Sequence, residues 1–155
     1  MLDLTPWAER ISTSEITAVL AADLDAAQNS RRFPVLALVP GRDKITTAPL
    51  SQGTRHRVTA QVLVVSGVGR GNQALGEQMV DRLAGLRRMV VHRLVGWTPP
   101  PVGISVPDRT WYDYSELPVM EHDTEVSWAG GQLLSMSQNA VYWVDAFTTD
   151  YWWSP

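Results

Sequence analysis

Apolar and polar residues alternate along residues 57–66, and this pattern predicts a β-strand. Four apolar residues at every second position would share one face of it: Val58, Ala60, Val62 and Val64. A second stretch, residues 33–40, is apolar at nearly every position and is bounded by Pro34 and Pro40, which predicts a short buried strand. Residues 41–53 are polar and are expected to connect the two strands. Residues 67–71 are rich in glycine and are expected to end the second one.

The clearest periodicity in the chain belongs to a helix that follows Asn72, a residue suited to capping it. Apolar residues recur at spacings of four, four, three, four and four: Leu75, Met79, Leu83, Leu86, Val90 and Leu94. Acidic residues lie early in this stretch and arginines late, which suits the helix dipole. Gly96 can serve as the C-terminal cap, and the prolines at 99–101 prevent the helix from continuing.

The N-terminal segment predicts a short helix and then an ambiguous stretch. Thr5 is a suitable N-cap with Pro6 at the first helical position, and Trp7 and Ile11 would share one face. Residues 16–27 fit either a continuous helical stripe or a short strand at 16–19.

After the long helix, the hydrophobic periodicity is first lost, which predicts a loop, and then returns in a form that predicts strands. Residues 102–125 contain two prolines and six acidic residues, and are expected to form an ordered loop. Gly130 and Gly131 precede two strands, residues 132–136 and 141–149, joined by a tight hairpin turn.

The order strand, strand, helix, strand, strand predicts an α+β fold. We expect a single domain over residues 1–155, with a loop excursion at 102–127. Its mixed or antiparallel sheet would carry the long helix on one face and end in a C-terminal β-hairpin.

Charge is distributed unevenly along the chain although the net charge is only −3. Residues 1–30 hold five acidic residues and one arginine, residues 31–93 hold eleven basic and three acidic residues, and residues 94–155 hold eight acidic residues and one arginine. These blocks can neutralise one another on one folded surface, or form separate patches that meet on neighbouring subunits. A DNA-binding patch is disfavoured because the basic block lacks a compact Lys/Arg run and the pI is about 5.5.

The composition and the N-terminal residues predict the cellular compartment in which the domain is made. The chain has no cysteine, so neither a disulfide framework nor a cysteine-based zinc site is encoded. The N-terminus carries early acid rather than a basic region, and the apolar runs are far shorter than a membrane span requires. We therefore expect a domain made in the cytoplasm, without a signal peptide or membrane contact.

No motif predicts catalysis or cofactor binding. Gly67 and Gly69 match the start of a dinucleotide fingerprint, but Asn72 occupies the third glycine position. A phosphate loop also needs a lysine, and Lys44 is the only one in the chain. The three histidines, His56, His92 and His122, are too far apart to suggest a metal site. No enzyme activity, cofactor or metal is expected.

Seven tryptophans are the compositional oddity. Trp7, Trp97 and Trp143 lie within predicted elements and are expected in the core. Trp152 and Trp153, together with Tyr151, lie close to the last residue, where large rings favour a contact between subunits or with a partner over folding back onto the same domain.

Charged residues supply further interaction candidates. Arg70 projects from the glycine-rich turn and could reach a neighbouring subunit. The acidic excursion could face a neighbour's basic block; the candidates are Arg55, Arg57, Arg87 and Arg88 against Asp113, Glu116 and Glu121. The alternative is that these acids pair with arginines of their own subunit.

Several segments in order resemble one family. They are residues 22–27, 33–40, 57–65 and 94–99, and the close of the chain at 141–151. The most specific pieces are the G-W-x-P motif at Gly96 and the W-x-D-x-F-x-T-D-Y motif that runs from Trp143 to Tyr151. Together they resemble the tail terminator (tail-completion) proteins of tailed bacteriophages and related prophages.

The resemblance implies a structural role in the virion. Such proteins form a ring, typically of six subunits, that caps the tail tube, stops its polymerisation and offers its other face to head-completion or neck proteins. The implied partners are further copies of the chain, the tail tube protein and the head-completion protein, with DNA passing through the lumen without sequence-specific binding. The implied location is the head-proximal end of the tail, assembled in the host cytoplasm.

The resemblance also bears on local structure and leaves alternatives. It favours a short strand near 16–19 and then a short helix, whereas residues 102–125 depart from the family pattern and receive no role from it. The alternatives are another neck or baseplate component, such as a head–tail joining protein, and a small nucleotide-binding enzyme.

Overall fold

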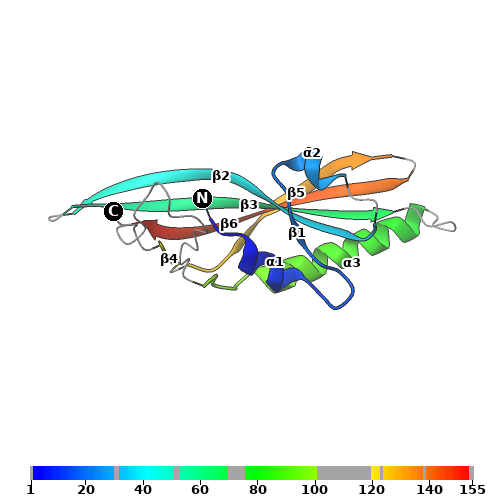
Figure 1. Cartoon of the computed structure of the whole chain (residues 1–155), viewed down its shortest axis with the longest axis horizontal. Helices are drawn as coiled ribbons and strands as arrows, with labels where there is room; N and C mark the ends of the chain where they lie inside the picture. Colours follow the sequence, from blue (N-terminus) through cyan, green and yellow to red (C-terminus); the bar gives the residue numbers. More distant parts are fainter. Residues whose placement is uncertain are drawn as a thin grey trace, which may run out of the picture.

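The computed structural model describes residues 2–29, 32–50, 53–69, 76–100, 120–122, 124–137 and 139–153. Three helices and six strands lie within these ranges (Figure 1). In chain order they are α1 Thr5–Ile11, β1 Val19–Leu20, α2 Leu24–Ala27, β2 Val35–Leu50, β3 Gly53–Gly69, α3 Gly76–Leu94, β4 Met120–His122, β5 Ser127–Met136 and β6 Ala140–Trp153. The α+β class, the long helix and the C-terminal hairpin of β5 and β6 are confirmed.

The strands form one mixed sheet in the order β1-β2-β3-β6-β4, with β5 also paired to β6. The β1–β2 pair is parallel, and the other pairs are antiparallel. β4 and β5 follow one another along the same edge of β6, because β4 pairs with Tyr151–Trp153 and β5 with residues 141–148. Among the described strands, β1 and the rest of β2 therefore lie at one edge of the sheet, and β4 and β5 lie at the other.

The main core lies between the sheet and the helices α1 and α3. The predicted stripe of α3 is buried from Met79 to Leu94, and the predicted face of β3 packs against it. Trp7 of α1 is fully buried and meets Trp97 edge to face, with ring centroids 5.5 Å apart. A smaller apolar cluster lies on the opposite face, where α2 covers Val35 and Tyr142 (Figure 1). Burial of both faces explains why residues 35–39 are apolar in succession.

Strands β2 and β3 are longer than the sequence pattern predicts. The polar stretch after Pro40 continues β2 to Leu50, so β2 and β3 form a long hairpin that extends past the helices (Figure 1). A shift in register between Pro40 and Asp43 accommodates the proline, because a bulge tolerates a residue without an N–H group. The expected connection at 41–53 is therefore wrong for residues 41–50 and 53, and residues 51 and 52 lie outside the described residues.

The glycines of β3 do not break the strand. A Cβ atom at Gly67 would lie 2.7 Å from the Tyr142 ring, and one at Gly69 would lie 2.7 Å from the Phe33 ring. These glycines make room for aromatic rings that cross the sheet, so their signal indicates close packing instead of a turn. The residues of the predicted break that follow Gly69 lie outside the described residues.

The N-terminal helices differ in detail from the expectation. α1 has Leu4 as its N-cap, and the Thr5 amide donates a hydrogen bond to Asp3 at 2.9 Å, so Thr5 is not the cap. Residues 16–27 resolve into strand plus helix, as the resemblance implied, although β1 begins only at Val19. In α2 the Asp23 carboxylate accepts a hydrogen bond from the Ala26 amide at 2.7 Å and caps the helix.

The C-terminal strands also exceed their predicted limits. β5 contains Gly130 and Gly131, and the chain bulges there with Gly130 at a φ of 98°. β6 continues past Thr149 to Trp153, where it pairs with β3 and β4. β4 itself is a regular element in the range expected to be loop, so that expectation is wrong for residues 120–122. Most of the predicted excursion lies outside the described residues.

The predicted end of α3 is confirmed. The helix ends at Leu94 and Gly96 has a φ of 81°, which confirms a glycine stop. Among the described residues, no helix is long and apolar enough to cross a membrane.

Candidate functional site

The most deeply buried charge in the described part of the chain is the carboxylate of Asp145 in the middle of β6. Asp145 is 1% exposed and accepts two hydrogen bonds from Arg87 of α3, from Nε at 2.8 Å and from Nη2 at 2.9 Å. The Trp128 indole of β5 donates a third hydrogen bond at 3.1 Å. The pair therefore joins the helix to the strands through a bidentate, charge-assisted contact.

Neighbouring residues shape the space around this pair. The Arg87 guanidinium lies 4.2 Å from the centroid of the Trp143 ring, in cation–π geometry. A Cβ atom at Gly131 would lie 2.1 Å from an oxygen of Asp145, so the carboxylate occupies the space that this glycine leaves open. The glycine at the β5 bulge thus makes the room that the Asp145 carboxylate needs in order to pair with Arg87.

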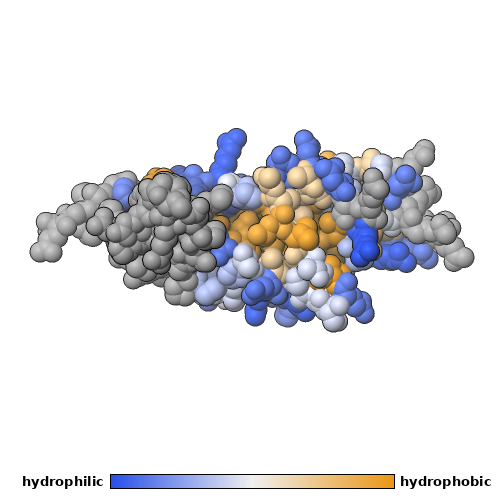
Figure 2. Space-filling model, viewed as in Figure 1, coloured by the Kyte–Doolittle hydropathy of each residue, from blue (hydrophilic) through white to orange (hydrophobic). Residues whose placement is uncertain are grey.

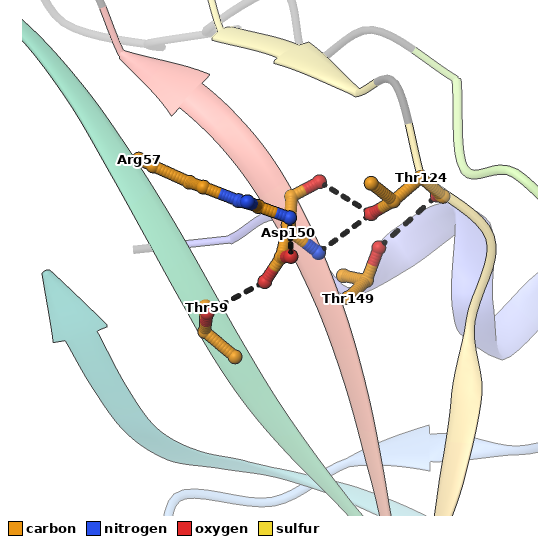
Figure 3. A network of polar contacts seen from close by, with 5 residues as sticks. All are labelled: Arg57, Thr59, Thr124, Thr149 and Asp150. Atoms are coloured by element: carbon orange, nitrogen blue, oxygen red, sulfur yellow. Dashed lines mark hydrogen bonds and ion pairs between the residues drawn. The ribbon is translucent and has the colours of Figure 1, made fainter. Parts of the chain in front are cut away.

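A second polar cluster holds the far end of β6 (Figure 3). Asp150 accepts hydrogen bonds from Arg57 and Thr59 of β3, across the strand pair. On the other side the Thr124 hydroxyl donates to the Asp150 carbonyl at 3.0 Å and accepts from the Asp150 amide at 2.8 Å. Thr124 lies between β4 and β5, so it continues the row of contacts along the edge of β6 (Figure 3).

Tyr151 belongs to the core. Its side chain is 2% exposed, and burial, followed by the nearby charge of Asp43, raises its pKa to about 12. The structure therefore gives this residue a packing role within its own chain, while a contact between subunits through Trp152 stays a prediction. Trp152 is half-buried, with the Arg57 guanidinium 5.9 Å from its ring centroid.

The pKa of Tyr151 predicts an alkaline loss of stability. The unfolded chain releases the phenol proton from about pH 10, whereas the folded chain holds it to about pH 12. The stabilisation is complete below pH 10 and is lost as the pH rises to 12, amounting to roughly 2–3 kcal/mol. Urea unfolding at pH 9 and pH 11.5 should show this loss in the parent chain. Tyr151→Phe should show a much smaller one, and an equal loss in both would contradict the assignment.

An open groove of about 840 Å³ lies beside the Arg87–Asp145 pair, between α3 and β5. Its lining is formed by Ala84, Arg87, Arg88, Met89, Val91, His92, Arg93 and Trp128. Arg88 is exposed, and the Trp128 ring is 47% exposed although its indole nitrogen is bonded. Arg93 is occupied elsewhere, because it donates to the Ser12 carbonyl at 2.9 Å and ties α3 to the end of α1.

At the opposite edge of the sheet, the short strand β1 carries exposed apolar side chains. Val19 and Leu20 of β1 are 50% and 54% exposed. Figure 2 shows apolar surface gathered over the middle of the molecule, where Figure 1 places β1. This edge continues into α2, which carries the exposed Asp25.

Among the predicted site residues on described strands, the structure brings Arg57 and Glu121 next to Trp152, but it does not gather the set into one site. Arg57 and Arg87 form ion pairs with Asp150 and Asp145, which favours internal pairing for both, and a contact of either with a neighbour stays a prediction. Their partners lie on β6, outside the predicted acidic excursion. Arg55, Glu121 and Trp153 lie on described strands, but their side chains are not described. Arg70, Asp113 and Glu116 lie outside the described residues.

Sequence reasoning missed Asp145 and Trp128. A signal for Asp145 existed: it is the one acid within the apolar and aromatic run of residues 140–147, and such an acid requires a buried partner. No spacing rule identifies that partner, because Arg87 is 58 positions away. Within the described ranges, no group of three His, Asp or Glu side chains could hold a metal ion.

The chain is a small α+β structural domain, made of a twisted sheet and one long helix. Polar clusters fasten the strands of the sheet to one another. The family model described as "Phage tail terminator protein" matches residues 1–115 of the chain. The chain therefore belongs to the phage tail terminator family, a family of structural proteins of bacteriophage tails. No curated protein matches it.

Proposed function

We propose that this chain forms a ring of six subunits that caps the finished tail tube. In this role it stops tube polymerisation and presents a surface to a head-completion or neck protein, at the head-proximal end of the tail. DNA would pass through the lumen without sequence-specific contacts. The observation that carries the proposal is the match to the tail terminator family over residues 1–115.

The shape of the subunit supports a ring. A head-to-tail ring needs two different surfaces on each subunit that fit one another. The two edges of the described sheet are unlike: β1 at one edge carries exposed apolar side chains, and β5 at the other adjoins a groove lined by Arg88 and Trp128. The polar clusters at Asp145 and Asp150 hold the strands between these edges, which keeps the two edges in a fixed relation.

The test is a phage in which the gene for this chain is deleted and supplied in trans. Without the protein we expect tails of uncontrolled length that fail to join heads, and with it tails of uniform length. Electron microscopy of tails that carry a labelled chain should show the label at one end only, next to the head, and averaged end views should show the number of subunits.

Other outcomes would favour the alternatives. Tails of normal length that lack heads would indicate a head–tail joining protein, and a label at the distal end would indicate a baseplate component. A shift in melting temperature with added nucleotide would indicate a nucleotide-binding enzyme. Any of these results would overturn the proposal.

A further inference from the structure

We infer that copies of this chain join head to tail by seating the β1–α2 edge of one subunit in the groove between α3 and β5 of the next. The first surface, the acidic edge, consists of Val19, Leu20, Ala22, Asp23 and Asp25. The second, the basic groove, consists of Ala84, Arg88, Val91, His92 and Trp128. This inference rests on the proposed ring and names the surfaces that close it.

The acidic edge combines apolar side chains with an available carboxylate. Val19 and Leu20 are 50% and 54% exposed on a strand that pairs with β2 on its inner side. Asp23 is committed to the cap of α2, but Asp25 is exposed two residues further on. Exposed apolar side chains on an edge strand are typical of a surface that is covered in an assembly.

The basic groove offers the complementary features. Its walls include the exposed Ala84 and the half-buried Val91, and the Trp128 ring stands at one side. Arg87 and Arg93 are engaged by Asp145 and by main-chain carbonyls, which leaves the exposed Arg88 as the guanidinium able to meet an incoming carboxylate. An apolar strand edge with one nearby acid fits such a groove in both hydrophobicity and charge.

A second copy of the chain is the occupant that this arrangement favours. Within one subunit the two surfaces lie apart, because β1 and β5 are on different sides of β3 and β6 in the strand order and α2 packs on the face of the sheet opposite α3. A contact between two different patches of the same chain is heterologous, and repeating it closes a ring when the rotation allows. Charge complementarity then sets the direction of assembly.

Crosslinking tests the contact directly, because the chain has no cysteine. In the chain with Asp25→Cys and Arg88→Cys, a short bismaleimide should join successive subunits into a ladder of multiples, both in concentrated solution and on isolated tails. Each single-cysteine chain should yield dimers at most. The matched control, Lys44→Cys with Arg88→Cys, moves one cysteine to the β2–β3 hairpin and should yield no ladder.

Charge reversal gives an independent measurement. By sedimentation velocity, Arg88→Glu and Asp25→Arg should each raise the concentration for half-assembly by about threefold or more, and the chain with both changes should recover most of the loss. Lys44→Glu makes the same charge change away from both surfaces and should leave assembly unchanged. The inference is overturned if the control pair forms the ladder and the test pair does not, or if no variant differs from Lys44→Glu.

The two proposals fail separately. If the protein is present at the head-proximal end of tails but the Asp25/Arg88 pair does not crosslink there, the contact is wrong and the proposed function stands. If the ladder forms in solution but the protein is absent from tails, the contact stands and the proposed function is wrong. Absence from tails together with no ladder would overturn both.

Discussion

Replacing Asp145 by alanine is expected to lower the free energy of unfolding by about 3–5 kcal/mol. The carboxylate is 1% exposed and accepts two hydrogen bonds from Arg87 and one from Trp128. Removing it leaves the Arg87 charge in a largely buried position with no anion to neutralise it. In urea the midpoint of unfolding should fall by about 1–3 M, measured by tryptophan fluorescence.

A double variant separates the charge effect from the loss of packing. Asp145→Leu combined with Arg87→Leu removes both charges, so it should cost less than the sum of the two single changes. The difference is the coupling energy between the two side chains. A midpoint for Asp145→Ala equal to that of the parent chain would show that the ion pair does not hold α3 on the sheet.

Ending the chain after Asp150 should have a comparably large effect. This truncation removes Tyr151, which is 2% exposed and contacts the main core. Loss of a buried aromatic side chain costs about 3–5 kcal/mol, which corresponds to a fall in Tm of about 6–20 °C for a chain of this length. Circular dichroism during heating measures this fall.

A chain ending after Tyr151 is the matched control. It keeps the core aromatic residue and loses the half-buried Trp152 with the residues beyond it. We expect this chain to melt within a few degrees of the parent. If both truncated chains melt together, the stability of this end resides in the residues after Tyr151, and the core role of that residue is wrong.

Regular burial patterns were sufficient to predict the centre of the fold. The stripe of α3 and the alternation in β3 follow directly from which side chains meet the core, and both are confirmed from Met79 to Leu94 and from Val58 to Val64. Strand ends were not predictable in this way. Residues 41–46 of β2 are largely exposed and polar, so their strand geometry comes from pairing with β3 and leaves no apolar pattern in the sequence.

The polar clusters were beyond sequence reasoning for a different reason. Asp145 meets Arg87, and Asp150 meets Arg57 and Thr59, only because the sheet places distant segments side by side. Glycine was misinterpreted for the same reason, since Gly67 and Gly69 make room for the rings of Tyr142 and Phe33 on neighbouring segments. Tertiary contacts that no local spacing encodes therefore decide both the site and the limits of the strands.

The length of β6 has a mechanical consequence. Fourteen residues, from Ala140 to Trp153, pair without a break along β3, which corresponds to a span of about 40 Å. Over most of that span β2 pairs with the other side of β3, so the three strands form one rigid unit. In a ring of such subunits, a change in the diameter of the central channel would come from rotation at the interfaces between subunits, because each subunit keeps its own length.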